Sequence, residues 1–311
     1  MKNNIKTDKN LRSVLIIGAN GFLGKNLSNL MNRENSLKHN LNLIAADLDN
    51  SNITSKIPFH TIDITNDYQT TKKINKISPD IVILTAAMTN VDQCEIEKDR
   101  ATKINLDGPK NIVKVCKKLG SKLIFMSTDY VFDGTKKKGT YSEKDHPNPL
   151  NHYAKTKYQA ELSIISSEIT YLICRTAVLY GWNKNKLNFI TWILKKLEEK
   201  EMISIVINQL NSPTFVINLA KILYKLIEKD AEGIFHTTGD DILSRYEMAL
   251  LCAEIFEYNK ELINPIESLK QIAKRPKNLG LDISKLKKLI GSELKIYSLT
   301  DGLKFMKNNR I

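Results

Sequence analysis

The 311-residue sequence has few cysteines and no long apolar run. Its four cysteines, Cys94, Cys116, Cys174 and Cys252, are far apart, and each could lie in an apolar stretch. We therefore expect neither a disulfide framework nor a metal site. No apolar run approaches the roughly 20 residues of a membrane-spanning helix, and the N-terminus lacks the apolar core of a signal peptide. These absences favour a cytoplasmic protein without a membrane partner.

Acidic residues are the minority, because 47 Lys and Arg against 34 Asp and Glu give a net charge of +13. A basic protein can attract nucleic acid, an anionic membrane or a phosphorylated small molecule. Here the lysines are scattered over predicted helices, and residues 136–138 form the only tight run. No basic stripe with interleaved aromatics, helix-turn-helix or zinc signature accompanies the charge. We expect a solvated surface that attracts anionic nucleotides, and no nucleic-acid partner.

Short apolar runs alternate with helical patterns over the first 181 residues. The runs are rich in Ile, Leu and Val, which suits strands buried on both faces of a parallel sheet. They span residues 13–18, 41–47, 80–87, 121–128 and 171–181. Between them, apolar residues recur at helical spacing. Such repeated strand and helix units predict a doubly wound α/β sheet.

The first run continues directly into GANGFLG, which places Gly18, Gly21 and Gly24 at the spacing GxxGxxG. A tight turn and a close backbone approach to a pyrophosphate need glycine, and a helix N-terminus offers N–H groups to the anion. Glycines alone would also suit a turn packed against a strand. The second run, however, ends at Asp47, where the adenosine ribose of a dinucleotide would lie. The alternative for Asp47 is a helix N-cap or a turn.

A Tyr followed four residues later by a Lys begins at Tyr68, Tyr153 and Tyr180. Only Tyr153 begins a helix after a strand that ends in two hydroxyl residues, Ser127 and Thr128. A hydroxyl there could hydrogen-bond a substrate carbonyl while Tyr153 supplies a proton. Bringing a Tyr pKa from about 10 to near neutrality needs roughly 4 kcal/mol. A Lys157 ammonium about 4 Å away would provide that at an effective dielectric of about 20. We interpret Tyr68 and Tyr180 as structural.

Six segments together resemble the extended short-chain dehydrogenase/reductase superfamily and, within it, the dTDP-4-dehydrorhamnose reductase family. They read GANGFLG (18–24), STDYVFDG (127–134), NPLNHYAKTK (148–157), CRTAVLYG (174–181), NQLNSPT (208–214) and KRPKNLGLD (274–282). The match follows the family's order over nearly the whole chain. The resemblance implies reduction by NAD(P)H of the 4-keto group of a nucleotide-linked deoxysugar, most simply a dTDP-linked one, for deoxysugar or cell-surface polysaccharide synthesis.

Motifs and resemblance together predict three sets of site residues and no metal site. The catalytic set is Thr128, Tyr153 and Lys157. The cofactor set adds to Tyr153 and Lys157 the residues Gly18, Asn20, Gly21, Phe22, Leu23, Gly24, Asp47, Asp63, Ile64, Thr85, Ala86, Ala87 and Thr89. The substrate set, which the resemblance implies, is Asp129, Tyr130, Val178, Asn188, Gln209 and Arg275. Asp47 favours NADH over NADPH because its carboxylate repels a 2′-phosphate.

The division of the chain follows from the change of pattern after residue 181. We predict a flexible lead over 1–12, a Rossmann-type domain over 13–181, and a smaller, mainly substrate-binding α/β region over 182–311. This last region contains helices at 188–200, 216–229 and 244–257 and strands at 203–207 and 233–239, and segments near 203–237 are expected to return to the sheet. A homodimer is compatible with the sequence.

Two positions depart from the family pattern. Val178 stands where members usually have Trp, and Asn208 where they usually have Asp. Both lie near the sugar nucleotide in the family, so Val178 predicts a differently shaped sugar pocket. Two alternatives to a reductase stay open. One is a non-catalytic cofactor-binding subunit resembling the methionine adenosyltransferase β subunit, and the other is a sugar-nucleotide epimerase or dehydratase.

Overall fold

A seven-stranded parallel sheet forms the centre of the computed structural model, which describes residues 11–38, 41–50, 57–136, 140–184 and 186–310. The strand order is β3-β2-β1-β4-β5-β6-β11. These strands are β1 (Arg12–Ile17), β2 (Leu41–Asp47), β3 (Phe59–Thr61), β4 (Ile81–Leu84), β5 (Lys122–Thr128), β6 (Tyr171–Thr176) and β11 (Gly233–His236). The order reverses between β1 and β4, which is the topology of the Rossmann fold. The predicted fold class is confirmed.

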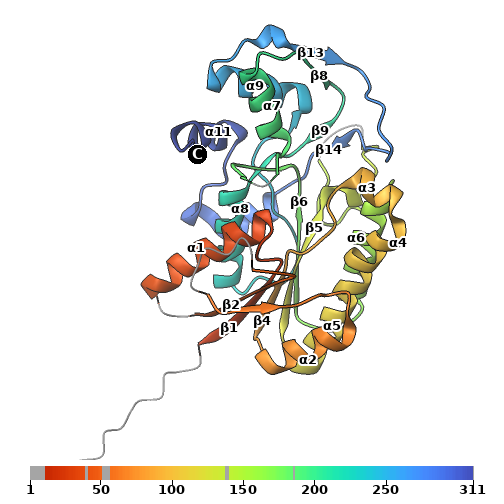
Figure 1. Cartoon of the computed structure of the whole chain (residues 1–311), viewed down its shortest axis with the longest axis vertical. Coiled ribbons are helices and arrows are strands. Elements are labelled where there is room, and N and C mark those ends of the chain that lie inside the picture. The colour runs from red at the N-terminus through yellow and green to blue at the C-terminus, as the bar shows by residue number, and fades with distance from the viewer. Residues whose placement is uncertain (1–10, 39–40, 51–56, 137–139, 185, 311) are drawn as a thin grey trace, which may run out of the picture.

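Helices cover both faces of the sheet, because its strands carry apolar side chains on both sides (Figure 1). Val14 and Ile16 of β1 point to one face, and Leu15 and Ile17 point to the other. The first face packs against α1 (Phe22–Lys38), α8 (Val216–Glu228) and α10 (Ser284–Ile290). The second packs against α2 (Asp67–Ile77), α5 (Gly108–Leu119) and α6 (His152–Ile165).

The C-terminal region forms a second apolar core, at the top of Figure 1. Its helices are α7 (Phe189–Glu198), α9 (Arg245–Phe256) and α11 (Leu299–Asn308). Its short strands are β8 (Ile203–Val206) with β13 (Ile263–Ile266), and β9 (Leu210–Asn211) between β12 (Leu243–Ser244) and β14 (Asn278–Leu279). The remaining helical segments are α3 (Val91–Ile96), α4 (Lys98–Thr102), the π-helix η1 (Lys103–Asp107), η2 (Asp129–Val131), η3 (Lys260–Leu262) and η4 (Gly291–Glu293).

Two strand predictions are wrong in part. The run 171–181 divides into β6 and β7 (Leu179–Tyr180), and β7 pairs with β10 (Thr214–Phe215) outside the main sheet. The division lies at Val178, whose φ of +40° is one that β-branched residues rarely adopt. Of the segments expected to return to the sheet, β11 does so, whereas β8 pairs with β13. A short apolar strand does not specify its partner, since any sheet edge could receive it.

Other features of the sequence have plain structural outcomes. The four cysteines are buried free thiols. Most of the predicted lead, residues 1–10, lies outside the described residues, and Arg12 already belongs to β1. Part of the lysine run also lies outside them, at residues 137–139. Among the described helices, none is long and apolar enough to cross a membrane.

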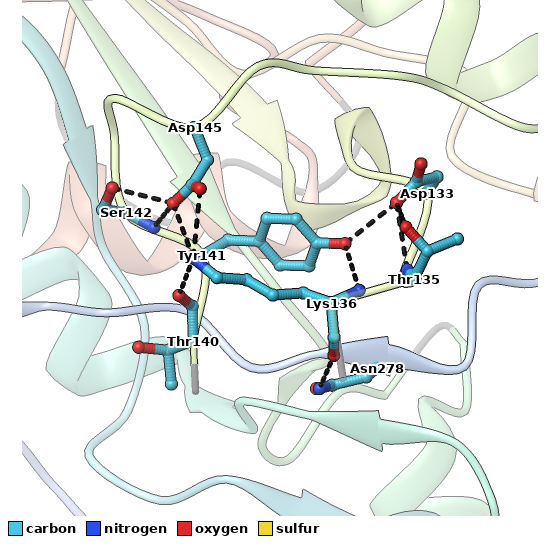
Figure 2. Close-up of polar contacts among 8 residues, drawn as sticks. All are labelled: Asp133, Thr135, Lys136, Thr140, Tyr141, Ser142, Asp145 and Asn278. Carbon is cyan, nitrogen blue, oxygen red and sulfur yellow. Dashed lines mark hydrogen bonds and ion pairs between the residues drawn. The ribbon is translucent and has the colours of Figure 1, made fainter. Parts of the chain in front are cut away.

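The connection from β5 to α6 carries a dense polar network, shown in Figure 2. Asp133 accepts hydrogen bonds from Thr135 and from the Tyr141 hydroxyl, the latter at 2.9 Å. Lys136 pairs with Asp145 at 3.0 Å. The network is joined to β14, because Asn278 donates to the Lys136 carbonyl at 2.9 Å. It therefore holds residues 133–136 and 140–145 together and against β14.

The two carboxylates of this network predict a loss of stability in acid. A backbone hydrogen bond from Ser142, with further hydrogen bonds, lowers the pKa of Asp145 to about 2. Burial raises the pKa of Asp133, but its hydrogen bonds outweigh burial and lower the pKa to about 2. Since unfolded Asp titrates near about 3.9, this stabilisation is present above that pH and is lost as the pH falls toward 2.

We expect Asp145→Asn to lower the free energy of unfolding by about 1 kcal/mol at neutral pH, allowing for solvent screening of a partly exposed pair. The difference from the unaltered protein should shrink as the pH falls from about 4 toward 2, because the stabilising charge of the wild-type carboxylate is then lost. Urea unfolding at several pH values measures both effects. Asp107→Asn, at an exposed position, is the control. A difference that did not change with pH would contradict the role of ionised Asp145.

Candidate active site

Two positions at the turn after β1 have space for glycine only. Gly18 has a φ of +91°, and a Cβ there would lie 2.5 Å from the backbone nitrogen of Ala86. A Cβ on Gly24 would overlap the carbonyl oxygen of Gly18. The Thr85 hydroxyl donates to the carbonyls of Ile17 and Gly18 at 3.0 and 3.1 Å, which joins the end of β4 to the turn. The N-terminus of α1 thus faces the point where the strand order reverses, and open α/β sheets bind ligands there.

Asp47 lies at the end of β2, beside this turn. Its carboxylate accepts the backbone N–H of Asn20 at 2.9 Å and that of Leu48 at 2.8 Å. Asn20 donates its side-chain amide to Asp49, but its buried Oδ1 has no hydrogen-bond partner among the described residues. Glycines at Gly18 and Gly24 let the backbone approach a diphosphate, and the orphaned Asn20 acceptor fits a ribose hydroxyl of a dinucleotide.

A cavity of about 1010 Å³ opens along this edge of the sheet. Every predicted catalytic and cofactor residue lines it, and so do four of the substrate set, Asp129, Tyr130, Val178 and Asn188. Asn188 also caps α7, accepting the Thr191 N–H and donating to the Gly181 carbonyl at 2.7 Å. The cavity is at the upper end of the range for ligand pockets, which is roughly 300–1,000 Å³.

Two residues of the predicted substrate set do not line the cavity. Arg275 instead pairs with Asp92 at 3.0 Å and donates to the Ala273 carbonyl. Gln209 accepts the Arg245 N–H on its carbonyl, and its side chain faces Gln271 at 3.4 Å. Both residues therefore contact neighbouring protein groups and do not form part of the cavity surface.

Thr128 and Tyr153 come from adjoining elements. Thr128 ends β5, and Tyr153 is the second residue of α6, whose N-terminus is capped by Asn151 through the Ala154 N–H at 2.9 Å. Burial raises the pKa of Tyr153, and a hydrogen bond with Thr128 opposes the rise. The expectation of a near-neutral Tyr153 pKa is therefore wrong for the protein alone. A tyrosine protonated at neutral pH suits a proton donor.

Lys157 lies one turn further along α6, with its side chain almost fully buried. Its Nζ is 3.9 Å from the centroid of the Phe125 ring. Burial lowers the pKa of Lys157 to about 7, and the charge of Glu161 opposes the fall. Glu161 is itself held by Arg175 at 2.6 Å and by the Ser127 hydroxyl at 2.5 Å. Hydroxyl acceptors from a ligand would favour the charged form of Lys157.

The structure adds residues that the sequence did not indicate. Asn105, in the π-helix η1, accepts the Met88 N–H at 2.9 Å and donates to the Met88 carbonyl at 3.0 Å, which holds the segment after β4. Arg245, at the start of α9, also lines the cavity. Neither residue interrupts or marks a periodic pattern, so spacing alone offered no signal.

Asp129 and Tyr130 lie at the end of the cavity nearest the C-terminal region. Asp129 receives hydrogen bonds from Thr128 at 3.0 Å and from Asn211 at 3.2 Å. Burial raises the pKa of Asp129 to about 7. The Tyr130 ring meets the Tyr153 ring edge-on, with centroids 6.4 Å apart. By contrast, Tyr68 is exposed and Tyr180 is buried in the C-terminal core, so neither lines the cavity.

A family model described as "RmlD substrate binding domain" matches residues 12–306. The chain belongs to this family. It is 30% identical over 293 residues to dTDP-4-dehydrorhamnose reductase of Aggregatibacter actinomycetemcomitans, covering 89% of this chain and 93% of that one. It is also 30% identical to methionine adenosyltransferase 2 subunit beta of Rattus norvegicus, covering 89% and 82%. The crystal structure of dTDP-4-dehydrorhamnose reductase from Bacillus anthracis in complex with NADP superposes with a TM-score of 0.84, at 31% identity, covering 96% and 100%.

Proposed function

We propose that this protein reduces the 4-keto group of a nucleotide-linked deoxysugar with NAD(P)H, as a dTDP-4-dehydrorhamnose reductase does. The observation that carries the proposal is the joint placement of Thr128, Tyr153 and Lys157 on one cavity with the glycine turn. The 30% identity to the Aggregatibacter actinomycetemcomitans protein, which is named dTDP-4-dehydrorhamnose reductase, supports the proposal. So does the NADP in the Bacillus anthracis structure.

The side chains divide the chemistry between them. The cofactor, when bound, supplies the hydride. Thr128 donates a hydrogen bond to the ketone oxygen, and Tyr153 gives that oxygen its proton as the hydride reaches the carbon. Lys157 stabilises the phenolate that Tyr153 becomes and offers its N–H groups to ribose hydroxyls. Asp47 and the glycine turn bind the adenosine end.

The test is oxidation of NADH or NADPH in the presence of dTDP-4-keto sugars, followed by absorbance. We expect turnover with at least one of them and none without the sugar nucleotide. Tight cofactor binding without turnover on any 4-keto sugar nucleotide would contradict the proposal.

The methionine adenosyltransferase relative supports a second candidate function, a non-catalytic subunit that binds the cofactor. This role requires a stable complex with a methionine adenosyltransferase but no turnover of a keto sugar. Co-purification from the source cell, together with the reductase assay, separates the two functions. The retained proton-transfer set favours the reductase.

Asp47 predicts a preference for NADH. Its carboxylate lies at the end of β2 with one oxygen on the Asn20 N–H, and a 2′-phosphate brought there would meet its charge. We expect a higher kcat/KM with NADH than with NADPH, and a smaller ratio in Asp47→Ala. Steady-state kinetics with both cofactors measures the ratio. A preference for NADPH of more than about tenfold by the unaltered protein would rule out the assigned role of Asp47.

A further inference from the structure

Arg245 is presented to the cavity from a firmly held backbone position. It is the first residue of α9, and its N–H donates to the Gln209 carbonyl at 3.1 Å. Ser244 before it caps the helix in a reciprocal pair with Glu247. The strand β12 just before it pairs with β9. The half-buried Arg245 side chain therefore lines the cavity from the C-terminal region. The glycine turn lines it from the end of β1.

Aromatic side chains orient the guanidinium toward the catalytic residues. Its Cζ lies 4.5 Å from the ring centroid of Phe189, the first residue of α7. Its charge acts on the nearby Tyr130 hydroxyl, and the Tyr130 ring meets that of Tyr153. Tyr130 thus lies between Arg245 and Tyr153, the proposed proton donor.

Its charge lacks the counter-ion that the other arginines have. Six arginines of the described residues each lie within 4.0 Å of a carboxylate, and they are Arg12, Arg33, Arg100, Arg175, Arg275 and Arg310. Arg245 has no such ion pair among the described residues. The nearby Asp129 acts on it through space, but Thr128 and Asn211 engage the Asp129 oxygens. A half-buried guanidinium with no carboxylate beside it is free to pair with an anion that a ligand brings into the cavity.

We propose that Arg245 binds the diphosphate of the substrate and so selects a nucleoside diphosphate sugar. This inference rests on the proposed function and identifies the group that anchors its substrate. A planar guanidinium matches phosphate oxygens with two parallel hydrogen bonds. The glycine turn binds the pyrophosphate of the dinucleotide, so Arg245 is available to bind the diphosphate of the substrate. Arg275, the arginine expected for the substrate, is neutralised by Asp92 and does not line the cavity.

The experiment measures binding of free dTDP, UDP and GDP by calorimetry, with oxidised cofactor saturating so that the nucleotides cannot occupy its site. We expect at least one to bind the unaltered protein, and Arg245→Gln to weaken that binding roughly 10- to 100-fold. Arg245→Lys should fall between, because it keeps the charge but loses the planar fork. Thymidine, which has no phosphate, should bind all forms equally. Arg33→Gln removes a charge from the exposed surface of α1 and should change little.

In steady-state kinetics, Arg245→Gln should raise KM for the sugar nucleotide by the same factor by which it weakens nucleotide binding. It should leave the cofactor Kd unchanged. Circular dichroism and thermal unfolding establish that each variant is folded. The inference is overturned if no nucleoside diphosphate binds, if a folded Arg245→Gln or Arg245→Lys binds as the parent does, or if Arg33→Gln loses as much affinity. A protein that binds dTDP through Arg245 yet reduces no keto sugar would refute the proposed function and leave this inference standing.

Discussion

Tyr153→Phe should lower kcat by roughly 10²–10⁴-fold, because it removes the one positioned group that protonates the product oxygen. The ring keeps its place at the start of α6 and its edge contact with Tyr130. Cofactor affinity and thermal stability should therefore change little. The measurement is NADH or NADPH oxidation at saturating sugar nucleotide, with cofactor binding measured separately.

Tyr68→Phe is the matched control for this prediction. Tyr68 has a Lys four residues later, as Tyr153 does, but three-quarters of its surface is exposed and it does not line the cavity. Turnover should be unaffected by its substitution. Unaltered turnover in Tyr153→Phe would refute the proton-donor role, and a loss shared by both variants would point to a general effect of removing hydroxyls.

Lys157→Met should damage turnover and cofactor binding together. The ammonium is needed both to stabilise the Tyr153 phenolate and to hold ribose hydroxyls, so we expect kcat/KM to fall by at least about 10². The cofactor Kd should rise in the same variant. This pattern differs from that of Tyr153→Phe, which spares binding. Lys155→Met, at an exposed position of the same helix, should leave both quantities unchanged.

Although Lys157→Met should lose activity, we expect it to gain thermal stability. Burial lowers the pKa of Lys157 to about 7, so between that pH and the value of about 10.4 for free Lys the unfolded chain binds more protons than the folded one. The cost of the buried charge is therefore complete below about pH 7 and disappears toward pH 10. Without cofactor, the variant should melt above the parent at pH 6, with the gain fading at high pH. A variant that melts lower at every pH would show that Lys157 makes a net stabilising contact.

The sequence by itself determined the features that depend on local chain properties. Unbroken Ile, Leu and Val runs specify strands buried on both faces, and so predicted the doubly wound sheet. Gly18 and Gly24 are glycines because a Cβ at either position would overlap the backbone of the turn. Tyr153 and Lys157 share a helix face because one turn of α-helix separates them. These relations span a few residues, so they can be read without knowing where the rest of the chain goes.

Only the tertiary structure decided what depends on distant segments. The partner of β8 is β13, about 60 residues later in the chain, and the break at Val178 follows from pairing of β7 with β10. Which cavity arginine has no carboxylate beside it was decided by tertiary packing, since Arg100 also lines the cavity but pairs with Glu97. Asp92 approaches Arg275 and neutralises it, while Arg245 is left facing the cavity. Charge pairing and burial are set by atoms that packing brings together, and sequence spacing carries no record of them.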